Sequence, residues 1–523
     1  MRVDGGRKER GGWMGGGAGV CDAREPAAPT LPCLTRQTAS RPVRLGAAAA
    51  IRYAEPMGDD WRHYPHVPTW GDPAHFTFPA VDGCRRDLGV STYYMDGFLH
   101  APGGATPRWA FIVILTDMWV LGRRVRASFY TAALFDLARG DYGTYTDYDF
   151  PRPCRRRRAY KLTGAPGRLD LSYDADAGLA RWTHARRADG TLEPFAWGLR
   201  LPGRDHQGRP FLLELDVRAT RPPAPLGGPA LGGAMMFLGA PVTYSYFQSG
   251  LDMHGHLRWG DLRTPVDGRI GWIDRQWADD DFTRYQDWRS TRYRHEWRVM
   301  HFDDGWDMSL FRQYLRPAHA AVVPWSGLSA QGPGPEHTLR ASTDVEVRVP
   351  EFIRSPGVVR AMSMLTDGPR WFPHRYAVRV PAWEMDVRAD PFVPSPAHGL
   401  PIEYWTGPVR LHGTLWGRPV AGHGFDERSR PWVHDFELAQ ALRESVRHLE
   451  DVETDAAWLL GYRCWEVEAL ARRRDVAQAG RHFRERVLPL LGALPPAARS
   501  RLAPLVTDLR MLLARSPGRW RRR

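Results

Sequence analysis

Four residues in the middle of the chain have side chains that together could carry out acid–base chemistry. Asp274, Trp277, Trp297 and Asp304 lie within residues 244–316, where Trp, Tyr and Asp cluster on what the pattern predicts to be consecutive strands. A carboxylic acid in an apolar pocket has a raised pKa and donates a proton near neutral pH. Aromatic faces stabilise the positive charge that results. The pattern therefore predicts protonation of an alkene or control of a cationic transition state.

The same residues also have a purely structural interpretation. Trp and Tyr commonly fill the core of a β-barrel, and Asp caps turns. Asp304 precedes Gly305, and Asp-Gly is a preferred pair in hairpin turns. Both interpretations stay open at this point.

We expect Asp304 and Trp277 to line one shared, mostly apolar cavity. The expected neighbours are Asp274, Arg275, Tyr244 and Trp405. In this hypothesis Asp304 donates the proton or orients the donor, and Trp277 grips a polyene or stabilises positive charge. A guanidinium near Asp304 would lower the pKa of Asp304 and keep it ionised, which favours binding over proton donation.

The sequence lacks residues that known metal-binding and nucleotide-binding motifs require. The string that starts at His295-Glu296 lacks the second His of a zinc protease, because Val299 stands in that place. His254 and His256 have no third ligand nearby in the sequence. Neither a GxSxG elbow nor the GK[ST] of a P-loop occurs. We therefore predict no metal and no cofactor of any kind.

The elements that must position these residues are predicted to be β-strands throughout residues 57–432. Phe211, Leu213, Leu215 and Val217 occupy every second position and so lie on one side of the chain, which is the period-two pattern of a half-buried antiparallel strand. Many short strands with frequent turns indicate closed barrels or sandwiches. We predict two tandem antiparallel β-barrels, over residues 57–240 and 241–432, meeting near residues 235–260.

Both ends of the chain differ from this β-region. Leu438, Leu442, Ser445, Leu449 and Val452 follow a 4-3-4-3 spacing, which predicts a helical stripe used as core. Residues 433–523 are therefore expected to form a small helical segment with a basic tail. Residues 1–56 lack an apolar period and are expected to be a disordered, dispensable tail.

The composition of the chain limits the classes of binding partner that we expect. The chain has 523 residues and a net charge of +13, but it lacks the spacing of zinc fingers and of RNA-binding motifs, so we expect no nucleic acid partner. Five widely spaced cysteines without a CxxC pair favour a reducing, cytoplasmic setting. No apolar run approaches the ~18 residues of a membrane span. We expect association with a membrane surface only as a route to an apolar substrate.

The string from Tyr244 through Gly255 and Gly268 to Trp277 resembles the central signature of the carotenoid 1,2-hydratase (hydroxyneurosporene synthase) and AttH-like family. Further motifs agree in their order, and the resemblance covers roughly residues 85–430. These motifs are Ser91–Gly97, Phe129–Gly143, Trp297–Gly305, Tyr376–Trp383 and Tyr404–Gly424.

The resemblance implies two lipocalin-like β-barrels in tandem and an activity that needs no cofactor. Hydratases of this family protonate a terminal isoprenoid double bond, and water captures the tertiary carbocation. Their pattern, H-x-W and then Y-x-D, is carried over here by Trp277 and Asp304, whereas Arg275 and Phe302 replace the His and the Tyr. These two departures remove a proton relay and leave the barrel and its aromatic cavity intact.

Three functions follow from the resemblance: a hydratase of a carotenoid or other isoprenoid, a cyclase or pericyclase of secondary metabolism, and a non-catalytic carrier of an apolar ligand. The first is favoured. The expected catalytic residues are Asp304, Trp277 and Asp274. The expected substrate-binding residues are Arg275, Tyr244, Trp272, Phe302, Trp297, Trp405 and Tyr404.

Overall fold

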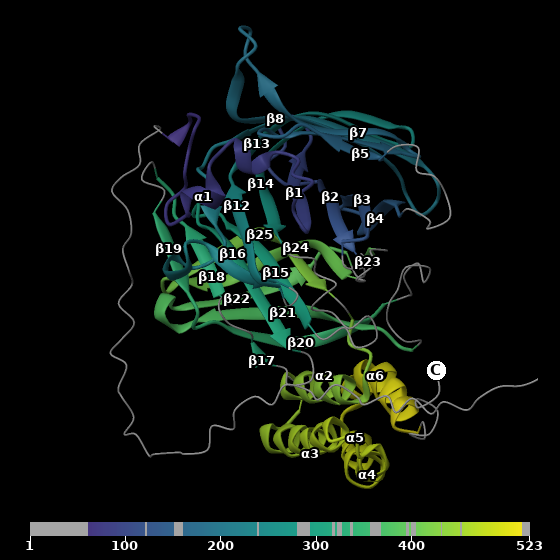
Figure 1. Cartoon of the computed structure of the whole chain (residues 1–523). Helices are drawn as coiled ribbons and strands as arrows, with labels where there is room; N and C mark the ends of the chain where they lie inside the picture. The colour runs from purple at the N-terminus through teal and green to yellow at the C-terminus, as the bar shows by residue number, and fades with distance from the viewer. Residues whose placement is uncertain are drawn as a thin grey trace, which may run out of the picture. The chain divides into compact units, whose positions relative to one another are not determined.

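The computed structural model describes most of the chain between residue 61 and residue 514 (Figure 1). The described residues are 61–120, 123–150, 160–237, 240–279, 293–315, 320–321, 327–334, 338–355, 368–393, 397–398, 404–429, 431–449 and 452–514. The expected N-terminal tail and the basic C-terminal end lie outside these ranges.

Two antiparallel sheets carry the fold, as the alternating pattern predicts. The first sheet has 14 strands, in the order β4-β3-β2-β1-β14-β13-β9-β8-β7-β6-β5, with β12 also pairing with β14 and carrying β10 and β11. Its strands are β1 Val90–His100, β2 Trp109–Val120, β3 Val125–Asp136, β4 Asp141–Asp149, β5 Leu162–Gly164, β6 Asp170–Ala175, β7 Gly178–Arg186, β8 Leu192–Arg204, β9 Pro210–Ala219, β10 Ala224–Pro225, β11 Ala234–Phe237, β12 Ala240–Ser249, β13 Leu251–Trp259 and β14 Leu262–Ala278.

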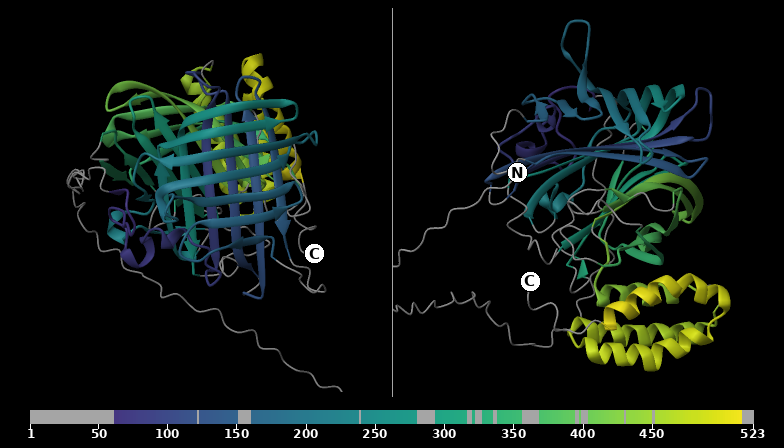
Figure 2. Two further views of the ribbon diagram at one scale, coloured as in Figure 1. Left: turned by 90° about the horizontal axis from the view of Figure 1, so that it is seen from above. Right: turned by 90° about the vertical axis from the view of Figure 1, so that its right-hand side faces the viewer.

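The first sheet curls over on itself so that its two halves cross and face each other (Figure 2). The space between them is filled by one large apolar core that includes Tyr93, Trp182, Trp197, Tyr246 and Trp277. The alternating residues of β9 that face this core are buried, which confirms the predicted strand. The aromatic residues are therefore core residues of the barrel as well as candidates for chemistry.

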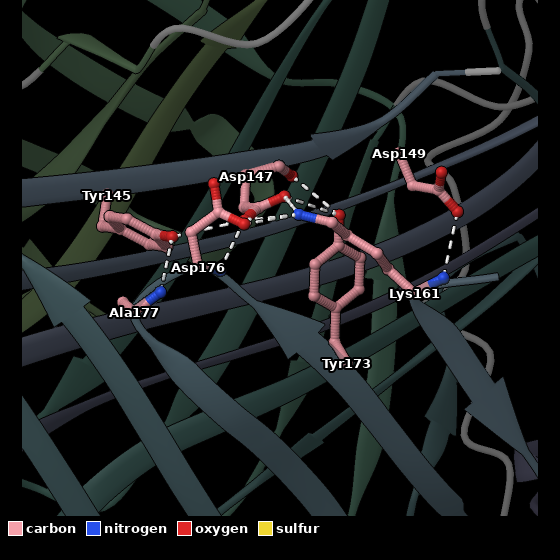
Figure 3. Close-up of polar contacts among 7 residues, drawn as sticks. All are labelled: Tyr145, Asp147, Asp149, Lys161, Tyr173, Asp176 and Ala177. Carbon is pink, nitrogen blue, oxygen red and sulfur yellow. Dashed lines mark hydrogen bonds and ion pairs between the residues drawn. The ribbon is translucent and has the colours of Figure 1, made fainter. Parts of the chain in front are cut away.

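The first barrel is closed by side chains where its two edge regions, β4 and β5–β6, come together; we name this contact the seam (Figure 3). Asp147 on β4 lies at its centre. Its carboxylate accepts hydrogen bonds from Lys161 Nζ at 2.8 and 3.0 Å, Tyr173 Oη at 3.2 Å and the backbone N–H of Asp176 at 2.8 Å. The backbone N–H of Lys161 donates to Asp149 at 3.0 Å. These hydrogen bonds take the place of part of the backbone pairing that would otherwise join β4 to β5–β6.

Asp147→Ala is expected to lower the free energy of unfolding by about 2–4 kcal/mol, because it leaves several buried donors without an acceptor. Asp176→Ala is the matched control. Asp176 binds the same ammonium at 3.0 Å, but its side chain is 87% exposed, so its loss should change the free energy by no more than about 0.5 kcal/mol. Chemical denaturation of both variants measures the difference, and equal losses would contradict a structural role for the buried carboxylate.

The second sheet has 11 strands, in the order β19-β18-β16-β15-β25-β24-β22-β21-β20, with β17 and β23 at its margins. The first sheet forms a nearly closed barrel and the second a half-barrel. The strands of the second are β15 Tyr293–Phe302, β16 Asp307–Leu315, β17 Ala320–Ala321, β18 Gly327–Gln331, β19 Leu339–Ser342, β20 Glu346–Arg354, β21 Trp371–Val380, β22 Met385–Pro391, β23 Ala397–His398, β24 Tyr404–Leu415 and β25 Arg418–Ser429.

The change from one sheet to the other falls later than the sequence indicated. Strands β12, β13 and β14 follow residue 240, but they pair with one another, with β9 and with β1 in the first sheet. The second sheet begins only at β15. The expected boundary at residue 240 therefore lies inside the first barrel, because β14 supplies the partner that β1 needs.

The concave side of the second sheet contains a fully buried ionic network rather than an apolar core alone. Arg298 binds Asp426 at 3.0 Å and Glu296 at 3.1 Å. Arg428 binds Asp426 at 2.5 Å. Both guanidinium groups lie over the ring of Tyr376, at 4.2 and 5.0 Å. Two buried cations and two buried anions neutralise each other there.

The two sheets are joined by a second apolar core on their facing sides. It includes Tyr94, Trp272, Trp297 and Phe425, and the rings of Tyr94 and Trp297 meet edge to face with centroids 4.9 Å apart. Arg221 crosses between the sheets and binds Asp307 at 2.8 Å. The packing therefore fixes residues of the second sheet directly behind β1 and β14.

Helices follow the second sheet, as predicted. They are α2 Asp435–Arg447, α3 Thr454–Arg472, α4 Val476–His482, a π-helical turn Phe483–Val487, α5 Leu488–Ala493 and α6 Pro496–Ala514. Before them, the helical elements within the described residues are short turns, namely α1 Pro73–Phe76, η2 Ala80–Asp82, η3 Pro229–Leu231 and η6 Pro381–Trp383. Glu437 caps α2 by accepting from the N–H groups of Val433 and His434 at 2.9 and 3.1 Å. Leu438, Leu442 and Leu449 belong to the helical core, which confirms the predicted use of the stripe.

Candidate active site

A small buried cavity, named the chamber here, lies inside the first barrel. Its free volume is about 10 Å³, which is room for roughly one water molecule. It is lined by Asp82, Tyr93, Leu169, Trp182, Trp197, Tyr246, Ile273, Asp274 and Arg275. Two carboxyl-bearing residues and one arginine therefore border a mostly aromatic enclosure.

Strand β14 places its residues alternately on the two sides of the first sheet. Ile273 and Trp277 belong to the core inside the barrel, together with Tyr93 and Tyr246. Trp272 belongs to the core between the two sheets. Because side chains alternate along a strand, Arg275 faces the chamber, whereas Asp274 faces the second sheet.

Asp82 is the carboxyl group of the chamber. It ends the short η2 turn, is 1% exposed and accepts a hydrogen bond of 2.6 Å from Tyr246 Oη. Burial raises the pKa of Asp82 to about 6, although the Tyr246 hydrogen bond and the Arg275 charge oppose the rise. Asp82 is therefore poised to take up and release a proton near neutral pH.

Next to Asp82, the side chains of His184 and Tyr64 form a short series of polar contacts. His184 Nε2 lies 3.1 Å from Tyr64 Oη and 3.8 Å from Asp82 Oδ2. Its Nδ1 accepts from the backbone N–H of Leu169 at 2.9 Å, which assigns the proton of the neutral ring to Nε2. Burial lowers the pKa of His184 to about 4, so it is a neutral donor at physiological pH.

Arg275 is a buried cation that uses only neutral partners. It donates to Gln276 O at 2.7 Å, to Ser91 Oγ at 2.9 Å and to Thr92 O at 3.3 Å. Its guanidinium lies 4.0 Å from the ring centroid of Tyr93. Among the described residues, no carboxylate reaches it at ion-pair distance, and its Nε has no hydrogen-bond partner. A buried guanidinium in this state favours a ligand atom that carries or develops negative charge.

Trp277 lines an open cleft of about 710 Å³, named the cleft here, and lies beside Arg275 of the chamber. Its ring lies 5.4 Å from the Arg275 guanidinium on one side and packs against Phe76 at 5.3 Å. Tyr244 stacks on Trp277 at 5.9 Å and on His75 at 3.9 Å. The cleft is also lined by His75, Thr77, Val81, Cys84, Leu88, Pro166 and the surface residues Arg85 and Arg86. Its volume suits a small-molecule ligand.

Asp274 also borders the chamber, but its carboxylate is directed to the other side of the strand, between the two sheets. Ser245 Oγ donates to it at 2.7 Å and Gln276 Nε2 at 2.9 Å. Burial and the nearby charge of Glu427 raise the pKa of Asp274 to about 7. Asp96, which is also fully buried there, has its pKa raised well above the ordinary value by burial.

The raised pKa of Asp274 makes stability depend on pH. In the unfolded chain this carboxyl loses its proton near 3.8, and in the folded chain near 7. Between these values the folded state holds more protons, so stability falls as pH rises. Asp274→Asn should reduce the fall in the free energy of unfolding over this pH range by up to about 4 kcal/mol. The variant should therefore be more stable than the parent at pH 8. Thermal unfolding measured from pH 4 to 8 tests this, with exposed Asp304→Asn as the control; a decline that survives in Asp274→Asn would contradict it.

Asp304 does not share a cavity with Trp277, so that prediction is wrong. Asp304 is exposed in the turn between β15 and β16, and its carboxylate accepts from the Trp306 N–H at 3.3 Å. Gly305 has φ of 89°, a conformation that glycine adopts without strain. The Asp-Gly pair is used as a turn former, which was the structural interpretation of its sequence.

The other predicted binding residues lie in separate cores. Trp272 and Trp297 are buried between the sheets, and the Trp297 indole N–H donates to Ser309 Oγ at 3.0 Å. Phe302 is buried in the core of the second sheet. Trp405 is fully buried with its ring 6.3 Å from that of His374. The side chain of Tyr404 lies outside the described residues. Among the described residues of the predicted site, Trp277, Arg275 and Tyr244 are brought together beside the chamber, and Trp272 and Trp297 share the core between the sheets.

Several residues of the chamber gave no signal in the sequence. Asp82 lies in a turn with no recognisable motif, and His184, Trp182 and Trp197 come from strands β7 and β8. Trp182 and Trp197 line the chamber, and His184 lies beside Asp82, only because the sheet curls over. Arg275 was predicted from the sequence, and Tyr246 alternates with the predicted Tyr244 on β12.

Metal binding was not expected from the sequence. Among the described residues, no group of three or more His, Cys, Asp and Glu side chains has the arrangement needed to hold a metal ion. His254 is exposed and pairs with Asp267 at 2.9 Å. The absence of a metal and of cofactors stays a prediction.

The fold and the chamber define a class of protein: lipocalin-like tandem barrels, with a titratable acid enclosed by aromatic rings in the first barrel. Residues 167–427 match the family model described as AttH-like. This match supports the AttH-like part of the resemblance seen in the sequence.

Solved structures with a similar fold include an AttH from Nitrosomonas europaea, with 20% identity, coverage of 67% of this chain and 96% of that chain, and a TM-score of 0.49. Another is kievitone hydratase from Nectria haematococca, with 11% identity, coverage of 72% and 98%, and a TM-score of 0.47. A third is CghA with Sch210972, with 10% identity, coverage of 66% and 89%, and a TM-score of 0.35. No curated protein matches the chain.

Each helix within the described ranges is too short or too polar to cross a bilayer.

Proposed function

We propose that the protein is a cofactor-independent enzyme that transfers a proton on an unsaturated, mainly apolar small molecule with a carbonyl or enol oxygen. One observation carries the proposal: Asp82, hydrogen-bonded to Tyr246, faces the same aromatic chamber as Arg275, a buried guanidinium with neutral partners only. The AttH-like match of residues 167–427 supports an enzyme of this class.

The roles follow from charge. When water adds to a conjugated carbonyl, its oxygen bonds to the β-carbon, the carbon–carbon π bond breaks and negative charge moves to the carbonyl oxygen. Arg275 stabilises that oxygen. Ionised Asp82 takes the proton that water loses and then returns it to the α-carbon, which leaves the enzyme unchanged. A pKa of about 6 serves both halves of this cycle.

The apolar part of the substrate lies in the cleft in this proposal, and the reactive end reaches past Trp277. The chamber of about 10 Å³ is too small for more than a water molecule, whereas the cleft offers about 710 Å³. Binding therefore requires the rings of Trp277 and Phe76 to move aside. Aromatic faces on both sides of the passage suit a conjugated chain.

Hydration of an isolated terminal alkene, as in carotenoid 1,2-hydratases, is the second candidate. The enclosure of Asp82 by Trp182 and Trp197 favours it, since aromatic faces stabilise a cation. The guanidinium of Arg275 opposes it, because a tertiary carbocation in the chamber would lie beside a like charge. The first candidate therefore fits the chamber better.

The experiment is to incubate the full-length protein in ¹⁸O-labelled water with two substrate sets. One set contains conjugated enones with long apolar tails, and the other acyclic carotenoids and terpenes with terminal double bonds. Label incorporation into the enones, followed by mass spectrometry, supports the proposal. Incorporation into the second set alone supports alkene hydration. Ligands that co-purify or bind and stay unchanged in both sets would make the protein a carrier and overturn the enzyme proposal.

A further inference from the structure

Helix α3 presents an exposed row of aromatic residues that its own fold does not use. Trp458, Tyr462 and Trp465 are 67%, 41% and 46% exposed. Their spacing of four and then three residues places them on one face of the helix, and we name them the aromatic stripe. Exposed Trp and Tyr in a contiguous row are a mark of an interaction surface.

The opposite face of α3 is buried in the helical core. Ala457, Leu460, Cys464 and Val467 are buried there, against α2 and the helices that follow α3. The stripe is thus a second apolar face on a helix that needs only one for folding. In Figure 1, α3 lies on the outer side of the helical segment, while α2 packs against β20.

The rings of the stripe are ordered before any partner binds. Trp458 and Tyr462 stack with centroids 5.7 Å apart and planes 9° apart, and Tyr462 stacks with Trp465 at 5.7 Å and 29°. Arg463 lies 5.5 Å from the ring of Tyr462. Side chains held in this way lose little conformational freedom on docking.

Positive charge continues the same face at the C-terminal end of α3. Arg473 is the C-cap residue of α3 and Arg474 follows it, and both are exposed. Of the two acidic residues near the stripe, Asp455 lies in the first turn, and Glu466 is paired with Arg463 at 2.8 Å and with His482 at 2.7 Å. The net charge of the whole chain is +13. Aromatic rings beside arginines complement an anionic lipid surface.

We propose that the aromatic stripe, with Arg473 and Arg474, docks the protein onto the interface of an anionic lipid bilayer. Trp and Tyr rings are favoured at the level of the lipid headgroups because they combine an apolar body with a polar N–H or O–H group. The two arginines contact lipid phosphates and make the binding depend on salt. Docking of this kind places the helix along the surface without crossing the membrane. It holds whichever reaction the first barrel performs.

Vesicle flotation with the full-length protein tests this. The vesicles contain phosphatidylcholine alone, or phosphatidylcholine and phosphatidylglycerol in equal parts. The protein should float with the anionic vesicles and much less with the neutral ones. The triple variant Trp458→Ser, Tyr462→Ser, Trp465→Ser should lower the bound fraction about ten-fold or more. The double variant Arg473→Glu, Arg474→Glu should weaken binding and flatten its salt dependence.

The control is a double variant at exposed apolar residues of the first sheet, Val242→Ser with Leu262→Ser, which are 49% and 36% exposed. It should float like the unmodified protein, and thermal unfolding confirms that each variant is folded. Flotation that the stripe variant leaves unchanged, or an unmodified protein that does not bind anionic vesicles, would overturn the proposal. An unmodified dimer that fails to float and becomes a monomer in the stripe variant would also overturn it and assign the stripe to a second copy of the chain.

Discussion

Asp82→Asn should lower turnover by about 10²–10⁴-fold, the usual contribution of a general acid or base. Asn keeps the shape of the side chain and still accepts the hydrogen bond from Tyr246, but it does not exchange a proton. Because burial raises the pKa of Asp82 to about 6, the charged form is costly in the folded protein. The variant should therefore be at least as stable as the parent at pH 8, which separates lost chemistry from lost structure.

The pH profile gives an independent readout of the same residue. Turnover that needs ionised Asp82 rises as pH increases through about 6, and this inflection should vanish in the residual activity of Asp82→Asn. Asp304→Asn is the matched control, since Asp304 is exposed in a turn, and its turnover should stay unchanged. Full activity in Asp82→Asn would overturn the catalytic role of Asp82, and a collapse in Asp304→Asn would return that role to the residue first expected from the sequence.

Arg298→Met should cost about 3–5 kcal/mol in the free energy of unfolding, because it leaves two buried carboxylates with a single cation, Arg428. Asp426 lies 3.0 Å from Arg298 and Glu296 lies 3.1 Å away, and all three are buried. Burial alone would raise the pKa of Glu296, but the charges of Arg428 and Arg298 hold it below its ordinary value. Removing one of the two cations weakens that stabilisation.

Two further variants isolate the charge effect in the network. Arg298→Met combined with Asp426→Asn restores neutrality and should recover a large part of the lost stability, measured by chemical denaturation. Arg218→Met removes an exposed pair with Glu193 on the first sheet and should change stability by no more than about 1 kcal/mol. If the double variant is as unstable as Arg298→Met, the loss comes from packing rather than from an unpaired charge.

Local patterns in the sequence predicted the elements well. Alternation along β9 and the helical spacing of Leu438, Leu442 and Ser445 depend only on which residues lie near each other in the chain, and both were confirmed. Helix α2 ends at Arg447, before the last two residues of the predicted stripe, Leu449 and Val452. The boundary between the sheets was placed too early because it depends on pairing between distant strands. Val90 lies opposite Ala278 across β1 and β14, and no local pattern reports such a partner.

The candidate site was predicted only in part, because some of its residues come from parts of the chain that are distant in sequence. Trp277, Arg275 and Tyr244 lie on neighbouring strands within one stretch of sequence, so their association followed from the strand pattern. Asp304 lies on the same stretch, but the chain has by then entered the second sheet. Asp82 reaches Arg275 because an early turn packs into the barrel that β14 completes. The sequence holds no signal that pairs those two positions.

The pairing of β1 with β14 has a consequence for synthesis of the protein on the ribosome. Strand β1 ends at His100, and its partner β14 ends at Ala278. During translation the β1–β4 meander must wait, with one long edge unpaired, until β14 has left the exit tunnel. An unpaired edge is a template for pairing with other chains, and contacts of such long sequence separation form slowly. The nascent chain is therefore most prone to aggregate, and most dependent on chaperones, over this window of synthesis.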